Sequence, residues 1–212
     1  MFTIFLIGNI ASGKSTAARY LESRGAYRID LDAMVKDLYI PGSDLVASIA
    51  DEFGWDVLDE SGSVRFPVLA KRAFACSEQT KRLNVLVYPV LLEHLTRILS
   101  PSPCCGAFVP SHEFTVVEVS VAAQFTEAFG LADEVIAITA SLDVRRKRAI
   151  SRGMSPEDFD ARASVQPSEE ELCALASRVI PNEGDNDALF GALDNLLAEH
   201  GLIQSTSGGE YE

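Results

Sequence analysis

The sequence predicts an α/β domain in which helices flank a parallel sheet of five strands, and three observations support this fold class. Short apolar runs alternate with segments of helical periodicity along the 212 residues. A glycine-rich turn lies between the first apolar run and the first predicted helix. Acidic residues follow or interrupt two of the later apolar runs. Because the carboxyl ends of the strands form the ligand-binding edge of an open α/β sheet, these residues are candidates for a site.

The first element is a strand over residues 1–7, followed by the glycine-rich turn and a helix. The turn places Gly8, four residues, Gly13, Lys14 and Ser15 in the P-loop pattern G-x-x-x-x-G-K-[ST]. Its glycines let backbone N–H groups converge on a phosphate. Lys14 would reach the β- and γ-phosphates, and the Ser15 hydroxyl can bind Mg²⁺. An ordinary strand-to-helix turn would not explain the pair of Lys14 and Ser15.

The second strand is predicted over Tyr27–Ile29, and two aspartates, Asp30 and Asp32, follow it. A carboxylate at this edge, beside the P-loop, can accept a proton from an attacking hydroxyl or hold a magnesium-bound water. Asp32 is the stronger candidate of the two. The alternative, that Asp32 only caps the following helix, stays open.

The middle of the chain is predicted to be helical at about 41–100, with a turn-rich loop at 101–112 and a third strand at 114–121. This strand carries one charged residue, Glu118, within the apolar run TVVEVSV. A buried carboxylate must be paired or hydrogen-bonded. Glu118 is therefore a candidate to hold Mg²⁺ or its waters, and a position on an edge-facing side of the strand is the alternative.

The C-terminal part continues the alternation of strands and helices. Arg145, Arg148 and Arg152 fall on one face of a single predicted helix. Guanidinium groups keep their charge and bind phosphate oxygens bidentately, so the cluster favours a lid over a triphosphate, with a solvated basic face as the alternative. The predicted strands are 134–140 and 178–180, and the predicted helices are about 142–152, 156–165, 168–178 and a last one through Leu196.

Composition limits the classes of function. The net charge is −13 and the pI about 4.6, which argues against a nucleic-acid partner. No apolar stretch reaches the length of a membrane span, and residues 1–7 lack the basic start of a signal peptide, so we expect a cytoplasmic protein, with a monomer favoured. The expected organisation is one domain over 1–202, with a core at 1–40 and 114–202, a helical insertion at about 41–100, a lid at about 142–166 and a disordered tail at 203–212.

Several segments resemble the dephospho-CoA kinase family. They are GNIASGKSTAARYLESRGAYRIDLDAMVKDLYIPG with IADEFGWDVLDESGSV near the start, and VRRKRAISRGMSPEDFDARASVQPSEEEL with RVIPNEGD near the end. The resemblance covers about residues 3–200 and is strongest before residue 62 and after residue 134. It implies a P-loop NTPase fold of the nucleoside-monophosphate-kinase type, with the acceptor bound by the helical insertion.

The resemblance also implies an activity. Such kinases transfer the γ-phosphate of ATP, with Mg²⁺, to the ribose 3′-hydroxyl of dephospho-CoA, which is the final step of CoA biosynthesis. Asp32 would be the acid–base residue at the acceptor hydroxyl, with Lys14 and Arg148 as the other catalytic residues. The residues expected at the nucleotide are Gly8, Ala11, Ser12, Gly13, Lys14, Ser15, Thr16, Arg148, Arg152, Asn182 and Gly184, and those expected at the metal are Ser15 and Glu118.

The chain departs from the family pattern mainly in the acceptor half. Two further interpretations therefore stay open: a related P-loop kinase with another acceptor, and a protein that binds nucleotide without turnover. A GTPase is disfavoured, because the guanine-reading element N-K-x-D is absent. The departures are Tyr88-Pro89 for His-Pro, Arg65-Phe66 for Asp-Arg, Ser120 and Gln124 after the third strand, and Pro181 for an aspartate.

Overall fold

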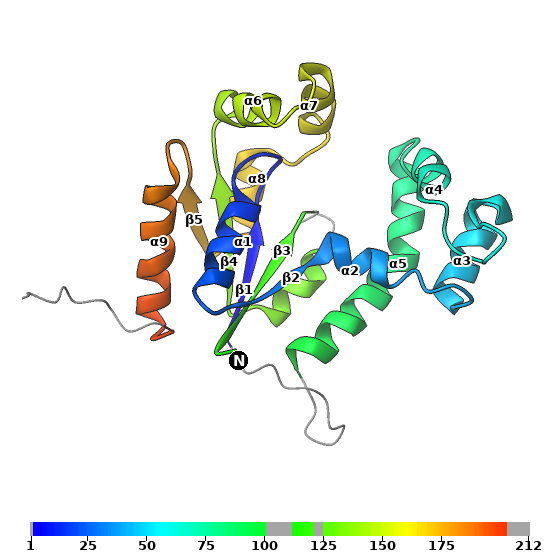
Figure 1. Ribbon diagram of the computed structural model, residues 1–212, viewed down its shortest axis with the longest axis horizontal. Coiled ribbons are helices and arrows are strands. Elements are labelled where there is room, and N and C mark those ends of the chain that lie inside the picture. Colours follow the sequence, from blue (N-terminus) through cyan, green and yellow to red (C-terminus); the bar gives the residue numbers. More distant parts are fainter. Residues whose placement is uncertain (1, 101–111, 121–124, 203–212) are drawn as a thin grey trace, which may run out of the picture. The chain divides into compact units, whose positions relative to one another are not determined.

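The structure, a computed structural model, describes residues 2–100, 112–120 and 125–202 (Figure 1). The predicted tail at 203–212 and most of the loop predicted at 101–112 lie outside the described residues. Gln124, one of the departures from the family pattern, also lies outside them.

The chain divides into two compact units. Met1–Asp30 and Val109–Glu212 form the first, and Leu31–Phe108 forms the second. The second unit begins before the helical insertion expected at about 41–100, and it includes Asp32. The single-domain organisation and the lid at about 142–166 stay predictions.

The first unit contains a parallel sheet of five strands in the order β2-β3-β1-β4-β5, which confirms the predicted fold class. β1 is the central strand, and its residues from Thr3 to Ile7 are all buried. Because all the strands run in the same direction, their carboxyl ends meet at one edge of the sheet. The strands are β1 Phe2–Ile7, β2 Tyr27–Asp30, β3 Phe114–Val119, β4 Glu134–Thr139 and β5 Arg178–Pro181.

Two helices of the first unit, α1 (Lys14–Ser23) and α9 (Asn186–Glu199), share an apolar core with the sheet. The rings of Tyr20 and Phe190 stack at 4.1 Å, and the Tyr20 hydroxyl donates to Asp194 at 2.8 Å. The glycine-rich turn is therefore anchored on one side by a buried strand and on the other by a buried helix. The shared core includes Ile4, Leu6, Ala17, Ala18, Leu21, Leu189, Leu193 and Leu196.

Three short helices follow β4, namely α6 (Leu142–Ser151), α7 (Pro156–Ala163) and α8 (Glu169–Ala174). A short 3₁₀ helix, Thr126–Leu131, precedes the same strand. α7 and α8 each begin at a serine whose side chain accepts a backbone N–H, the usual N-cap arrangement. These caps explain why the starts of α7 and α8 follow the sequence prediction closely.

The last of the three helices is shorter than the prediction of 168–178. α8 ends at Ala174, and Ser177, the residue before β5, is already hydrogen-bonded to β4. The Ser177 N–H donates to the Val135 carbonyl at 2.8 Å, and the Ser177 hydroxyl accepts the Val135 N–H at 3.0 Å. A backbone group that pairs with β4 cannot also continue a helix, and this pairing is invisible in the local periodicity.

The second unit is mainly helical in the residues described. Its apolar core joins α3 and α5 through buried side chains such as Val46, Ile49, Leu83 and Val87. α5 continues through Pro89 as a single helix. Within residues 2–100, 112–120 and 125–202, no helix is both long enough and apolar enough to cross a membrane. The helices of this unit are α2 Leu31–Asp37, α3 Asp44–Phe53, the 3₁₀ helix Trp55–Val57, α4 Phe66–Ala73 and α5 Ser77–Leu99.

Candidate active site

The backbone of the glycine-rich turn needs both of its motif glycines. Gly13 has φ 108°, in the left-handed region, and a Cβ at this position would lie 2.1 Å from Asn182 Nδ2. A Cβ at Gly8 would lie 2.8 Å from the Ile138 carbonyl oxygen. Ala11 also has a positive φ, 60°, which is uncommon for a residue with a side chain. The turn is thus closely packed against Asn182 and the Ile138 carbonyl.

α1 begins directly after this turn, with Lys14, Ser15 and Thr16 in its first turn. Lys14 Nζ donates to Ser120 Oγ at 2.9 Å, which holds the ammonium group beside the carboxyl end of β3. No acidic side chain stands in the first turn of α1, so the positive end of the helix dipole keeps its effect. This arrangement suits an anion such as phosphate.

Glu118 lies beside Ser15 and is almost fully buried, with 5% of its surface exposed. The Ser15 hydroxyl donates to Glu118 Oε1. β3, which carries Glu118, is an inner strand of the sheet between β2 and β1. The alternative of an acid on an edge-facing side is therefore wrong, and Glu118 belongs with the P-loop serine.

Arg28 of β2 pairs with this buried carboxylate, and the sequence analysis missed it. Arg28 Nη2 is 3.0 Å from Glu118 Oε2 and 3.7 Å from Asp30 Oδ2. Asp30 stands opposite Glu118 in the parallel pairing, and Arg28, two residues earlier, shares its face. The sequence did contain a signal for this contact, because Arg28 is a charged residue inside a short strand and a buried charge requires a partner.

Ser15 and Glu118 offer a hydroxyl oxygen and a carboxylate oxygen, which are the hard donors that Mg²⁺ prefers. No group of three or more His, Cys, Asp or Glu side chains that could hold a metal ion occurs in the part of the chain that the structure describes. A Mg²⁺ ion at this point would take its other ligands from phosphate and water. The two side chains therefore fit a magnesium–nucleotide complex.

Arg148 of α6 connects the P-loop to the loop after β5. Its Nη1 donates to the Asn182 carbonyl at 2.8 Å and to the Ser12 carbonyl at 3.4 Å, and its Nη2 donates to the Gly184 carbonyl at 2.8 Å. Asn182 is buried, and its Nδ2 donates to the same Ser12 carbonyl at 2.7 Å. Arg148 is half-buried, so the alternative of a solvated basic face does not hold for it.

Arg145 has yet another environment on the same helix. Its Nε donates to the Ala140 carbonyl at 3.0 Å, and burial lowers the pKa of its guanidinium group. The three arginines that helical spacing assigned to one face therefore differ in their contacts. Arg145 and Arg148 already donate to backbone carbonyls, so in this conformation they are less available to a ligand than an arginine without such partners.

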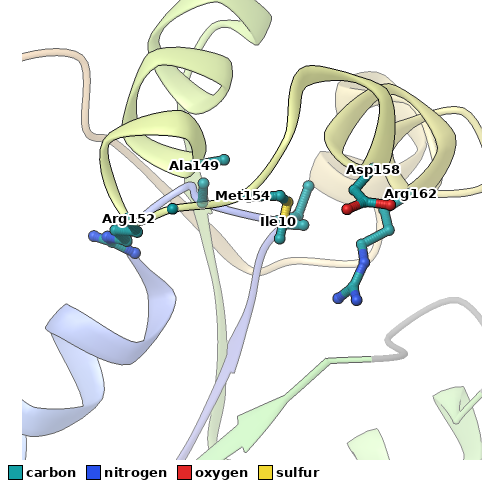
Figure 2. Close-up of a pocket in the computed structure, with 8 residues that line it drawn as sticks. Ile10, Ala149, Arg152, Met154, Asp158 and Arg162 are labelled. Carbon is teal, nitrogen blue, oxygen red and sulfur yellow. The ribbon is translucent and has the colours of Figure 1, made fainter.

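Arg152, at the C-terminal end of α6, lines an open cavity of about 390 Å³. Figure 2 shows Ile10 and Met154 near its middle, Arg152 on one side, and Asp158 and Arg162 on the other. Arg162 of α7 was missed by the sequence analysis, although it stands in the R-x-x-x-Q segment of the resemblance. The cavity therefore combines P-loop backbone with two guanidinium groups, which suits an anionic ligand.

Asp32 lies in the second unit, exposed in the first turn of α2. α2 begins at Leu31, so Asp32 is not its N-cap and the capping alternative is wrong. Burial and, to a smaller extent, the negative charge of Asp32 raise the pKa of Tyr88 to about 12. Tyr88 therefore presents a neutral phenol near this carboxylate at physiological pH.

Comparison with known proteins gives a consistent result. A family model described as dephospho-CoA kinase matches residues 2–188. The dephospho-CoA kinase of Corynebacterium efficiens is 32% identical over 200 residues, which cover 94% of this chain and 97% of that protein. The dephospho-CoA kinase of Anaeromyxobacter dehalogenans is 33% identical over 201 residues, which cover 94% and 92% of the two chains.

Solved structures are similar in fold. TT1252 from Thermus thermophilus superposes with a TM-score of 0.67 at 28% identity, covering 93% of this chain and 97% of that one. A shikimate kinase from Acinetobacter baumannii gives a TM-score of 0.52 at 16% identity, covering 96% of each chain. At that identity the second likeness shows the fold alone.

Proposed function

This chain belongs to the dephospho-CoA kinase family, and on that premise we propose that it transfers the γ-phosphate of ATP to the ribose 3′-hydroxyl of dephospho-CoA and releases CoA. The observation that carries the proposal is a P-loop whose lysine and serine stand beside a buried carboxylate, in a chain that matches the family along most of its length. Another acceptor, or nucleotide binding without turnover, is not favoured by these matches.

The P-loop binds the phosphates of ATP. The segment from Ala11 to Thr16 surrounds them with backbone N–H groups and the N-terminal end of α1. Lys14 exchanges the Ser120 hydroxyl for a phosphate oxygen and stabilises the charge that develops on the transferred group. Gly8 and Gly13 allow this backbone conformation, because a Cβ at either position would clash with neighbouring atoms.

Ser15 and Glu118 hold Mg²⁺ with the nucleotide. When bound, the ion would supply positive charge beside the phosphates. Glu118 orients the Ser15 hydroxyl by accepting its hydrogen bond, and Arg28 keeps the carboxylate in this orientation from the other oxygen. A hydroxyl and a carboxylate oxygen suit Mg²⁺, which is usually bound by one or two carboxylates together with substrate phosphates.

The arginines divide two tasks between them. Arg148 acts mainly by position, since it holds the loop of Asn182 and Gly184, which borders the adenine, against the P-loop. Arg152 lines the cavity and would turn to the phosphates, and Arg162 adds a second positive charge there. Because no hydrogen bond or ion pair engages the Arg152 guanidinium among the described residues, it can turn to the ligand without breaking a contact.

Asp32 acts at the acceptor. As the new O–P bond forms, the proton of the ribose hydroxyl moves to the Asp32 carboxylate, and the bond between the γ-phosphorus and the ADP oxygen breaks. Tyr88, in place of the family's histidine, can donate a hydrogen bond from a phenol that stays protonated. The helices of the second unit would supply the rest of the acceptor site.

The reaction consumes ATP and forms a small, water-soluble cofactor. This supports the cytoplasmic location expected from the sequence, which remains part of the proposal. A monomer, favoured from the sequence, remains part of the proposal.

The test is direct. The purified protein is incubated with Mg·ATP and dephospho-CoA, and the products are analysed by mass for CoA and ADP in equal amounts. The controls are an acceptor that lacks the ribose 3′-hydroxyl and the variant Lys14→Ala, and neither should yield phosphorylated product. Binding of ATP by the wild type without any formation of CoA would contradict the proposed acceptor.

A further inference from the structure

Gln166, in the segment that joins α7 to α8, contacts the P-loop although it lies far from it in the sequence. Gln166 Oε1 accepts the Ile10 N–H at 2.9 Å. The next carbonyl, that of Pro167, accepts a hydrogen bond from Asn9 Nδ2 at 3.0 Å. These two hydrogen bonds, between Asn9–Ile10 and Gln166–Pro167, are called the brace below.

The brace lies directly beside a strained residue. Ala11 has φ 60°, the only positive φ outside glycine in the part of the chain that the structure describes. The left-handed conformation costs a residue with a Cβ about 1 kcal/mol or more. The Ser12 N–H donates to the Asn9 carbonyl at 3.1 Å, which closes a tight turn with Ala11 inside it. Such a conformation persists only where surrounding contacts hold it.

Contacts hold this turn from two sides. On one side the Ser12 carbonyl accepts hydrogen bonds from Asn182 and Arg148. On the other side the Ile10 N–H is bound by Gln166, so this amide serves the shape of the loop rather than a phosphate. All of these partners belong to the first unit, and those on the Gln166 side lie in the segment between α7 and α8.

We infer that Gln166 is a positioning residue, which holds the P-loop in its strained, polyphosphate-binding shape before the nucleotide arrives. The inference rests on the proposed function only in that the P-loop binds ATP. Arg162, one helical turn before Gln166, lines the phosphate cavity, so one short segment carries both a cavity cation and the brace. The conformation of the segment from Arg162 to Gln166 is thereby coupled to the conformation of the P-loop.

The first test removes the acceptor with Gln166→Ala. In the nucleotide-free protein, amide hydrogen exchange at Ile10 should become at least about tenfold faster, because its N–H loses its protein partner. The dissociation constant for ATP, measured by calorimetry, should rise at least about fivefold, since part of the binding energy must now order the loop. The matched control is Val165→Ala, an exposed neighbour, which should change both quantities less than twofold.

Two further variants separate the brace from a general structural role. Gln166→Glu keeps an accepting oxygen, so Ile10 exchange in the nucleotide-free protein should stay within about twofold of the wild type. Ala11→Gly removes the strain, because glycine adopts this φ freely. Gln166→Ala raises the dissociation constant for ATP by a certain factor in the protein with Ala11. In the Ala11→Gly variant, the same substitution should raise it by less than half that factor.

The outcomes are distinguishable. Unchanged ATP binding and Ile10 exchange in Gln166→Ala would overturn the brace. An equal loss of ATP affinity on Gln166→Ala in the wild type and in the Ala11→Gly variant would overturn it as well. Rapid Ile10 exchange in Gln166→Glu would also overturn it. Failure of the wild type to bind ATP would instead contradict the proposed function, since the brace predicts only the difference between variants.

Discussion

The nucleotide end and the acceptor end of this protein differ in how exposed their assigned side chains are to solvent. In the first unit, Lys14 is hydrogen-bonded to Ser120, Ser15 to Glu118, and Arg148 to three backbone carbonyls. In the second unit, Asp32 stands exposed on the first turn of a helix. The phosphate site is thus organised before the ligand binds, whereas the carboxylate assigned to the acceptor is exposed to solvent.

This difference has a consequence for substitutions. A change at the nucleotide end removes a ligand contact and also disturbs neighbours that share the network. A change at Asp32 should alter proton transfer and leave the fold and the nucleotide site intact. The predictions below are designed to separate these two kinds of effect.

The largest effect is expected for Lys14→Ala. The substitution removes a point charge from the site where phosphoryl charge develops, so transfer should fall at least about a hundredfold, or about 2.7 kcal/mol of transition-state stabilisation. Initial rates of CoA formation measure it, with the exposed Lys81→Ala as a control. A rate within about threefold of the wild type would reject the P-loop assignment.

The next comparison is between two arginines of one helix. Arg148→Ala should lower the free energy of unfolding by about 2 kcal/mol, because it removes a donor from the carbonyl of the buried residue Asn182, and the melting temperature should fall by about 6 °C. Arg152→Ala should lower the melting temperature by less than about 2 °C while transfer falls at least about tenfold. Thermal melts and initial rates measure both.

Lys147→Ala is the matched control for this pair, since Lys147 is exposed on the same helix. If Arg148→Ala left the melting temperature unchanged, its carbonyl contacts would contribute little to the fold. A loss of stability in Arg152→Ala would indicate a structural rather than a ligand-binding role.

The smallest effect concerns Tyr88 and alkaline pH. Its pKa is raised from 10 in the unfolded chain to about 12 in the folded protein, so the folded state keeps the proton longer. The stabilisation is complete below pH 10 and is lost as the pH rises toward 12. The free energy of unfolding should therefore fall more steeply between these pH values in the wild type than in Tyr88→Phe.

Denaturant titrations at several alkaline pH values give this difference, and subtraction of the variant removes the contribution of the other tyrosines. Between about pH 6 and 9 the phenol is neutral, so Tyr88→Phe should change the level of activity but not the shape of the pH profile. A new ionisation in that range in the wild type, absent from Tyr88→Phe, would contradict the neutral phenol.

The two ends also differed in how well the sequence predicted them. The P-loop could be recognised because its chemistry depends on the spacing of adjacent residues, and the strand and helix around it followed local patterns. The partners of Arg148 could not be predicted, because Ser12 and Asn182 meet it only after folding. Helical spacing placed Arg145, Arg148 and Arg152 on one face but gave no information about backbone acceptors.

Other contacts of the first unit were missed for the same reason. The pairing of Arg28 with Glu118 and the contact of Gln166 with Ile10 join residues that are far apart in the sequence. The end of α8 was predicted too late because Ser177 pairs with β4, which no local pattern reveals. For Asp32, a helix that begins one residue earlier excludes the cap, and its role at the acceptor stays a prediction.

The most direct test of the central claim, that Asp32 supplies chemistry at the acceptor while the first unit binds ATP, is Asp32→Asn. The amide keeps the size of the side chain and can accept a hydrogen bond, but it cannot take up the proton. We expect the dissociation constant for ATP to stay within about twofold of the wild type, while transfer to dephospho-CoA falls about a hundredfold or more. Full transfer activity in Asp32→Asn would contradict the account and leave only the nucleotide site.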